Sequence, residues 1–73
     1  MARKLPLEKR LGVRVREVRQ RKEMSQMDLV REHDWTLSHW QKIERGDLDP
    51  RLSTVVKIAD SLGMTVSELL KGV

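Results

Sequence analysis

Apolar residues recur along most of this chain at the spacing of an α-helix rather than that of a β-strand. The clearest run predicts a helix over about residues 6–22 whose apolar face is formed by Leu7, Leu11, Val15 and Val18. A second run follows Pro50 and predicts a helix over about residues 51–62 whose apolar face is formed by Leu52, Val55, Val56, Ala59 and Leu62. No segment alternates between apolar and polar residues over a useful length, so the pattern indicates an all-α fold.

A recurring six-residue pattern predicts the starts of three more helices. An apolar residue precedes a Ser or Thr, and a second apolar residue follows four positions after that hydroxyl, as in a hydrophobic staple around an N-cap. The pattern predicts helices over about residues 25–33, 36–45 and 65–71. The first and last of these also have an acid at the third helical position, which completes a capping box, whereas the middle one has His39 there.

The joins between the predicted helices are short. Only Asp34 and Trp35 separate the second and third helices, which suits a steep crossing of the helix-turn-helix kind rather than an antiparallel hairpin. Gly46 and Gly63 are placed to end the helices before them. We therefore expect one domain over residues 1–73, a compact five-helix bundle with a helix-turn-helix over about residues 25–45 and a short basic arm over residues 1–5.

A helical wheel divides the predicted helix 36–45 into two faces. Trp40, Ile43 and Glu44 lie on the inner side, and Leu37 and His39 lie at the edges. The outer side carries Ser38, Gln41, Lys42 and Arg45. These side chains can reach base edges and phosphates from the helix of a helix-turn-helix that enters the major groove. Since Trp35 and Trp40 occupy the two staple positions, we expect their rings to meet in the core rather than to stack on bases.

Charge is distributed unevenly along the chain. Residues 1–22 carry nine basic and two acidic side chains, a net charge of +7, whereas residues 23–73 carry six basic and nine acidic ones, a net charge of −3. A basic segment on a mildly acidic body suggests an oriented surface for a polyanion, most simply nucleic acid. A solvated helix face explains the same composition equally well.

Several functional classes are disfavoured by composition. The chain has no Cys, and its two His with Asp34 do not match a metal site or a catalytic constellation, so we expect no metal, no cofactor and no enzymatic activity. No apolar run approaches the roughly 18 residues of a membrane span. The charged N-terminus leads into no secretory signal, so we expect a cytoplasmic protein. A basic helix lying on a membrane is also disfavoured, because its apolar residues are needed for the core.

Five sequence pieces together resemble one known family. The pieces R-x-R-E-V-R, M-S-Q-x-x-L, Q-K-I-E-R-G, P-x-L-S-T-V-V-K-I-A-D-S-L-G and V-S-E-L-L lie within about residues 11–70. They are similar to the Cro/repressor-type (lambda-repressor-like) helix-turn-helix regulators of bacteria and phages. The resemblance implies a five-helix domain, usually a homodimer on a palindromic operator in double-stranded DNA.

The resemblance also implies roles for individual residues. Base readout is implied for Leu37, Ser38, Gln41 and Lys42. Contacts to phosphate or to an edge base are implied for Gln26, Thr36, His39, Arg45 and Arg19. Arg19 and Glu44 match a pair that forms a structural salt bridge in some members. For the dimer interface we expect contributions from Val66, Leu69 and Leu70.

The chain departs from the family pattern around the turn. Asp34 stands where Gly is usual, and Asp can adopt the left-handed conformation at some cost. Trp35 and Trp40 stand where aliphatic residues are usual, and His33 and Val30 replace a common Leu and Ala. These substitutions suggest a repacked crossing between the two helices.

Two functional hypotheses follow from the sequence. The first is a sequence-specific transcriptional regulator, a repressor or activator, that binds as a homodimer and inserts helix 36–45 into the major groove of a palindromic operator. The alternative is an antitoxin or a restriction–modification controller that acts with a protein partner.

Overall fold

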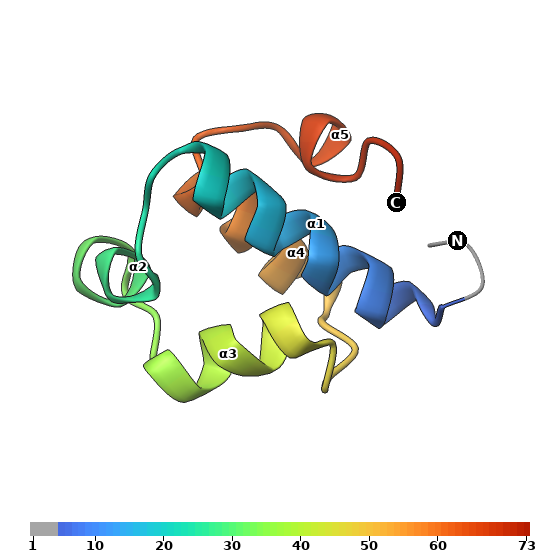
Figure 1. Ribbon diagram of the computed structural model, residues 1–73, viewed down its shortest axis with the longest axis horizontal. Coiled ribbons are helices and arrows are strands. Elements are labelled where there is room, and N and C mark those ends of the chain that lie inside the picture. Colours follow the sequence, from blue (N-terminus) through green and yellow to red (C-terminus); the bar gives the residue numbers. More distant parts are fainter. Residues whose placement is uncertain (1–4) are drawn as a thin grey trace.

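The computed structural model describes residues 5–73, and this part of the chain consists of five α-helices with no strand (Figure 1). The helices are α1 (Leu7–Arg21), α2 (Gln26–His33), α3 (Leu37–Arg45), α4 (Leu52–Ser61) and α5 (Val66–Leu69). α1 runs through the middle of the molecule with α3 on one side and α5 on the other, and α4 lies behind it in this view. The expected all-α, five-helix fold is confirmed. Most of the basic arm expected at residues 1–5 lies outside the described residues.

All five helices contribute buried side chains to the core, and both Trp side chains belong to it. Its largest fully buried side chains are Trp40, Leu29, Ile43, Ile58, Leu62, Leu69 and Val15. α1 comes closest to α3 at Gly12, where an added Cβ would lie 2.5 Å from the Glu44 carbonyl oxygen and 2.6 Å from that of Ile43. A residue without a Cβ is required here, because the α1 backbone packs directly against the last turns of α3.

The predicted caps define where three helices begin. The Ser25 hydroxyl accepts a hydrogen bond from the Asp28 N–H (3.0 Å), and the Asp28 carboxylate accepts one from the Ser25 N–H (2.7 Å). Thr65 and Glu68 form the same capping box at α5. The Thr65 N–H, and after it the Thr65 hydroxyl, lowers the pKa of Glu68 below its ordinary value. These local bonds supply partners for helix-terminal N–H groups that would otherwise have none.

The third cap has no acid and relies on the aromatic pair. The Thr36 hydroxyl accepts a hydrogen bond from the His39 N–H at 3.1 Å. The rings of Trp35 and Trp40 meet edge to face with their centroids 5.1 Å apart, so the predicted staple between them is confirmed. Both rings are buried, which excludes a role as a base-stacking platform.

The apolar faces predicted for α1 and α4 need three corrections. Leu7, Leu52 and Val56 were expected in the core, but they are 57%, 75% and 41% exposed. On α4 the inner side includes Ile58 instead, which is fully buried, and Val56 points about 100° away from Val55 around the helix. Leu7 and Leu52 lie in the first turns of their helices, where they line an open groove.

The last helix is shorter than predicted. The pattern indicated a helix over about residues 65–71, whereas α5 spans Val66–Leu69 and Leu70 is its C-cap. The Lys71 N–H donates to the Glu68 carbonyl, a bond three residues back, and Gly72 then takes a left-handed φ of 80°. The chain therefore tightens into a turn after one helical turn of α5.

Candidate nucleic-acid interface

The join between α2 and α3 is a tight turn that α4 holds in place. Asp34 has a left-handed backbone (φ 59°, ψ 43°), as predicted for the position where Gly is usual. The Lys57 Nζ donates to the Asp34 carbonyl at 3.0 Å and lies 4.3 Å from the centroid of the Trp35 ring. The Trp35 Nε1–H donates to the buried Ser61 hydroxyl at 2.9 Å. Lys57 and Ser61 could not be identified from the sequence, because they contact the turn from α4, and periodicity within one helix gives no information on contacts between helices.

One buried carboxylate joins the first three helices. Glu44, on α3, accepts from Arg19 of α1 at 2.6 Å (Nε) and 3.0 Å (Nη2). It also accepts from the Gln26 Nε2 of α2 at 3.2 Å and from the Trp40 indole N–H within α3. The side chains of Arg19 and Glu44 are only 11% and 5% exposed. This cluster fixes the position of α3 relative to α1 and α2.

The hydrogen bonds of Arg19 argue against the contact with a DNA phosphate that the family resemblance implies for this residue. Its remaining Nη1 donates to the Met24 carbonyl at 2.9 Å, so every nitrogen of the guanidinium has a partner within the protein. Nη1 and Nη2 each keep a second N–H, but the Arg19 side chain is only 11% exposed, which favours the structural role over a phosphate contact. Arg19 is thus a structural residue that links α1 to α3 and to the start of α2.

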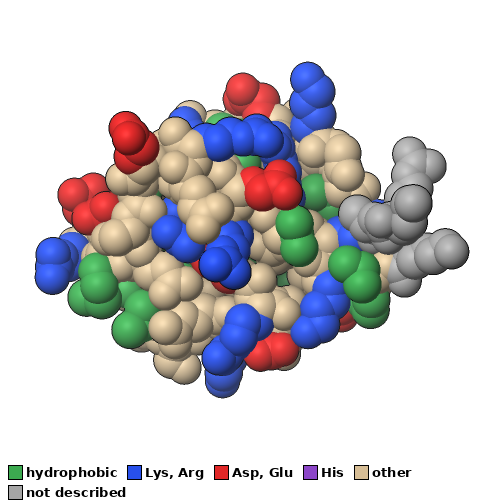
Figure 2. Space-filling model, viewed as in Figure 1, with side chains coloured by type: hydrophobic (Ala, Val, Ile, Leu, Met, Phe, Trp, Pro, Cys, Tyr) green, Lys and Arg blue, Asp and Glu red, His purple; other side chains and the backbone are tan. Residues whose placement is uncertain are grey.

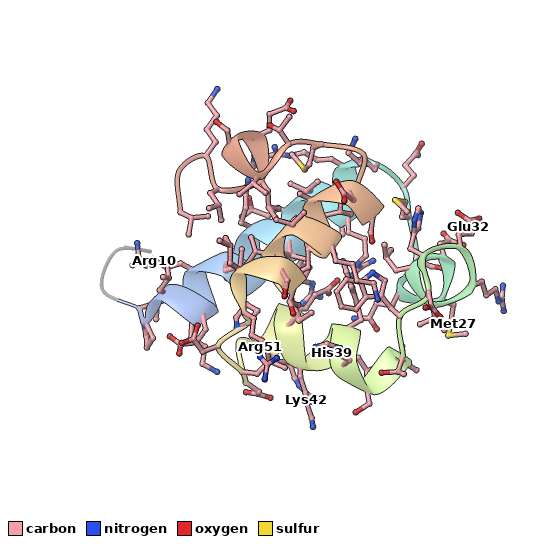
Figure 3. All side chains as sticks on the ribbon, turned by 180° about the vertical axis from the view of Figure 1, so that it is seen from behind. Arg10, Met27, Glu32, His39, Lys42 and Arg51 are labelled. Atoms are coloured by element: carbon pink, nitrogen blue, oxygen red, sulfur yellow. The ribbon has the colours of Figure 1, made fainter. Side chains whose placement is uncertain are left out.

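The outer face of α3 is polar and open to solvent. Leu37 (38% exposed), Ser38, His39, Lys42 and Arg45 are exposed, and Gln41 is half-buried. Lys42 projects from α3 away from the body of the protein (Figure 3). His39 keeps an exposed position while its ring packs edge-on against Trp35, with the centroids 5.3 Å apart. The Thr36 hydroxyl already accepts the α3 cap, which leaves its O–H free to donate outward.

Most basic side chains of residues 1–22 bind the protein itself. Arg14 donates to the Leu69 and Glu68 carbonyls at 3.0 and 2.8 Å, and Lys9 donates to the Arg45 carbonyl at 2.9 Å. Arg10 donates to the Leu5 carbonyl at 3.2 Å, and Arg21 lies 3.8 Å from Glu17. Figure 2 accordingly shows Lys and Arg interspersed with Asp and Glu rather than gathered in one block. Arg3 and Lys4 lie outside the described residues.

A small polar pocket opens between α1, α2 and α3. It has a volume of about 170 Å³ and is lined by Arg16, Gln26, Gln41, Glu44 and Arg45. The Gln41 Nε2 donates to the Gln26 Oε1 at 3.4 Å, so the two amides join α3 to α2 at this point. Arg16 was not among the expected site residues. Its spacing of three residues before Arg19 places it on the same side of α1 and is the signal that could have identified it.

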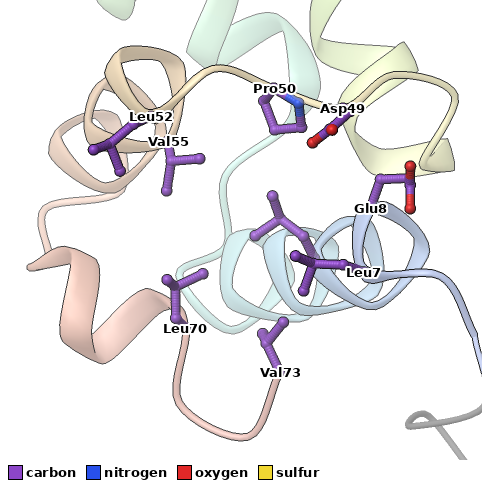
Figure 4. Close-up of a pocket in the computed structure, with 9 residues that line it drawn as sticks. Leu7, Glu8, Asp49, Pro50, Leu52, Val55, Leu70 and Val73 are labelled. Atoms are coloured by element: carbon purple, nitrogen blue, oxygen red, sulfur yellow. The ribbon is translucent and has the colours of Figure 1, made fainter.

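An apolar groove of about 280 Å³ lies between the start of α1, the segment that follows α3, the first turn of α4 and the end of the chain (Figure 4). It is lined by Leu7, Glu8, Leu11, Asp49, Pro50, Leu52, Val55, Leu70 and Val73. Of the residues expected at a dimer interface, Leu70 lines this groove and is 40% exposed, and Val66 is half-buried. Leu69 is fully buried in the core of its own chain, which leaves no exposed surface for a contact with a second copy.

Two other observations bear on the functional class. Within residues 5–73, no three His, Asp or Glu side chains converge on a common point that would suit a metal ion. None of the five helices in this range is long and apolar enough to cross a membrane.

Comparisons with known proteins bear on the same region. Residues 10–71 match a family model described as a helix-turn-helix domain. The chain is 33% identical over 64 residues to the HTH-type transcriptional regulator DdrOP3 of Deinococcus deserti, a match that covers 88% of this chain and 50% of that protein. The structure is similar to the apo form of ComR from S. thermophilus, with a TM-score of 0.79 and 32% sequence identity over 89% of this chain and 22% of that chain. The chain thus spans half the length of the first relative and less of the second.

Proposed function

Because the chain belongs to the helix-turn-helix domain family, we propose that it is a DNA-binding transcriptional regulator of the Cro/repressor type. The observation that carries this proposal is the α2–turn–α3 unit, whose inner side is fixed by Glu44 and whose outer side is a solvent-exposed polar strip. A helix held in this way can enter the major groove without changing its own packing. The name of the relative DdrOP3 supports the same function.

The proposal divides the α3 face into two kinds of contact. Leu37, Ser38, Gln41 and Lys42 are proposed to read bases, with Lys42 suited to guanine O6 and N7 and Leu37 to a thymine methyl group. Phosphate or edge contacts are proposed for Gln26, Thr36, His39 and Arg45. Arg19 is omitted from this set because its side chain is only 11% exposed and already binds Glu44 and the Met24 carbonyl.

We further propose that the chain acts as one domain, residues 1–73, and binds DNA as a homodimer through the apolar groove. Leu52 and Leu7, 75% and 57% exposed, are the most exposed of the large apolar side chains within residues 5–73, and both line this groove. Asp49 and Pro50, which follow α3 in the chain, line it as well. Two copies meeting here would bring the C-terminal ends of their α3 helices toward a common axis. This arrangement suits two half-sites one helical turn apart on DNA.

Selection of bound fragments from genomic DNA tests the DNA-binding proposal. The wild type should enrich a palindromic sequence, and Lys42→Ala should weaken binding to it by roughly 5- to 150-fold and relax the preference at one base pair, the loss expected for one base contact. Lys22→Ala removes the same charge at the end of α1 beside α5 and should preserve both affinity and preference. Failure of the wild type to enrich any sequence, or equal losses in the two variants, would refute sequence-specific binding by α3.

Leu52→Ser tests the dimer separately. Since Leu52 is 75% exposed, the variant should fold normally, yet it should sediment as a monomer at concentrations where the wild type is a dimer. Val56→Ser is the matched control, because Val56 is exposed on the same helix but does not line the groove. A dimer that persists in Leu52→Ser would show that the interface lies outside the groove. A stoichiometric complex with a different protein would favour the alternative of an antitoxin or controller that acts with a partner.

A further inference from the structure

The polar pocket collects hydrogen-bond donors from three helices. Arg16 comes from α1, Gln26 is the first residue of α2, and Gln41 and Arg45 come from α3. The amino end of α2 contributes the positive end of its dipole beside this opening. Two guanidinium groups and two amides around one opening form a set that suits an oxyanion.

Arg16 differs from the other basic residues of α1. Among the described residues, the side chains of Lys9, Arg10, Arg14, Arg19 and Arg21 all have partners within the protein. In the same part of the chain, Arg16 and Lys22 donate no side-chain hydrogen bond and form no ion pair. Besides the Thr65 N–H and hydroxyl, Lys22 is close enough to Glu68 of α5 to lower the pKa of that carboxyl, and α5 lies on the other side of α1 from α3 (Figure 1). Arg16 is therefore the described α1 cation that is both unpaired and next to α3.

The carboxylate at the base of the pocket does not cancel this positive charge. Glu44 is already paired with Arg19 and accepts further bonds from Gln26 and Trp40. Because a carboxylate only accepts, it holds the Gln26 amide with Nε2 inward and Oε1 toward the Gln41 Nε2. Each amide has a second N–H with no hydrogen-bond partner among the described residues.

Arg45 is available despite its contact with an acid. Its Nε lies 3.1 Å from Asp47, but the two side chains are 62% and 46% exposed. Exposed pairs of this kind contribute little stability, so Arg45 can turn to another anion at low cost. Asp47 would keep its contact with the Lys9 Nζ at 3.4 Å.

We propose that the polar pocket binds one phosphate of the DNA backbone and that Arg16 is its principal ligand. Arg45 supplies the second cation and the side-chain amide of Gln26 completes the donor set, while Gln41 stays bonded to Gln26 beside the pocket and keeps its proposed base contact. The proposal rests on the proposed DNA-binding function, which it extends by assigning an α1 residue to the interface. Of the seven basic residues of α1 and its C-cap, Arg16 is the one whose charge contributes to DNA affinity.

Salt titrations test the assignment. A labelled duplex of about 30 base pairs, long enough for two half-sites, is titrated with wild type, Arg16→Gln and Lys22→Gln between about 50 and 200 mM salt. Arg16→Gln should reduce the salt slope by about 0.9 per subunit and weaken binding at low salt by roughly tenfold. Lys22→Gln loses the same charge and should change affinity by less than about twofold, since solvent and salt screen a distant charge. Arg16→Lys keeps the charge and should keep the slope.

The outcomes separate this proposal from the proposed function. The phosphate site alone would be overturned if the wild type binds the duplex but Arg16→Gln keeps the same salt slope. Equal losses of DNA affinity in Arg16→Gln and Lys22→Gln would overturn it as well. A wild type that binds no duplex at low salt would overturn the DNA-binding function and the site with it. Thermal melts of all variants should stay close to the wild type, because neither side chain donates a hydrogen bond or forms an ion pair within the described residues.

A free anion is distinguished by a second measurement. Inorganic phosphate is added at constant ionic strength while the side-chain amide signals of Gln26 and Gln41 are followed by NMR. These signals should shift with the duplex and stay in place at micromolar phosphate. Saturation by micromolar phosphate would assign the pocket to a free phosphate instead of DNA.

Discussion

Replacement of Glu44 should show how strongly the positioning of α3 depends on one carboxylate. Glu44→Leu removes the acceptor of Arg19, Gln26 and Trp40 at a side chain that is 5% exposed, and it leaves the Arg19 charge 11% exposed and unpaired. Breaking a buried ion pair by removing one partner costs about 3–5 kcal/mol. A domain of 73 residues has a total stability of roughly 4–11 kcal/mol, so this one change should consume much of it.

Urea unfolding followed by Trp fluorescence measures the effect. With a slope of about 1 kcal/mol per molar urea, the midpoint of Glu44→Leu should fall by roughly 3–5 M, or the variant should already be unfolded in water. The double variant, Arg19→Met with Glu44→Leu, also removes the charge that Glu44→Leu alone leaves unpaired. Its loss of unfolding free energy should therefore be smaller than the sum of the two single losses by at least about 2 kcal/mol. The unpaired N–H groups of Gln26 and Trp40 should keep the double variant below the wild type.

The control is a set of exposed ion pairs at the C-terminal end of α3. Asp47→Asn weakens contacts with Lys9 and Arg45 whose side chains are about half exposed, and it should cost less than about 1 kcal/mol. A loss below about 1 kcal/mol in Glu44→Leu, or simple additivity in the double variant, would refute the view that this carboxylate positions α3.

Three further predictions follow from the backbone and the caps. Gly12→Ala should destabilise the domain by about 1–3 kcal/mol in thermal melts, because its Cβ would lie 2.5 Å from the Glu44 carbonyl oxygen, and an unchanged melt would contradict this close contact. Asp34→Gly should raise the stability by about 1 kcal/mol, since Gly tolerates the left-handed φ of 59°, and a loss in chemical unfolding would instead assign a stabilising role to the Asp side chain. The pKa of Glu68 is lowered on folding, so its contribution to stability should be present above its unfolded pKa and be lost as the pH falls through the lowered value. NMR titration of that carboxyl should show its pKa rising in Thr65→Ala, and an identical pKa would rule out the cap as its cause.

Helix starts were predictable because their causes are local. A Ser or Thr N-cap and the two apolar staple residues act within six positions, so the beginnings of α2, α3 and α5 could be read from the chain. The turn at Asp34 was predictable for a related reason, since Asp is one of the few residues that adopts the left-handed conformation. The inward side of α3 also followed from spacing alone.

Other features depend on which elements meet in space. Leu69 is buried and Leu52 is exposed, although both lie on apolar periodic positions, because burial is decided by the presence of a neighbouring helix. The basic segment is the clearest case. Net charge could not distinguish Arg14, which binds the carbonyls at the end of α5, from Arg16, which stays free beside α3. The contacts of the pocket therefore required the structure.

The close approach at Gly12 has a consequence for how binding specificity can change. Backbone rests against backbone between α1 and α3, so the separation of these helices is set by atomic radii rather than by side-chain choice. Exchanging the outward residues of α3, such as Ser38 and Lys42, should then alter the preferred operator while the helix stays in the same place. The domain should accordingly tolerate replacement of its reading residues as a set, and new specificities should arise without a matching redesign of its interior.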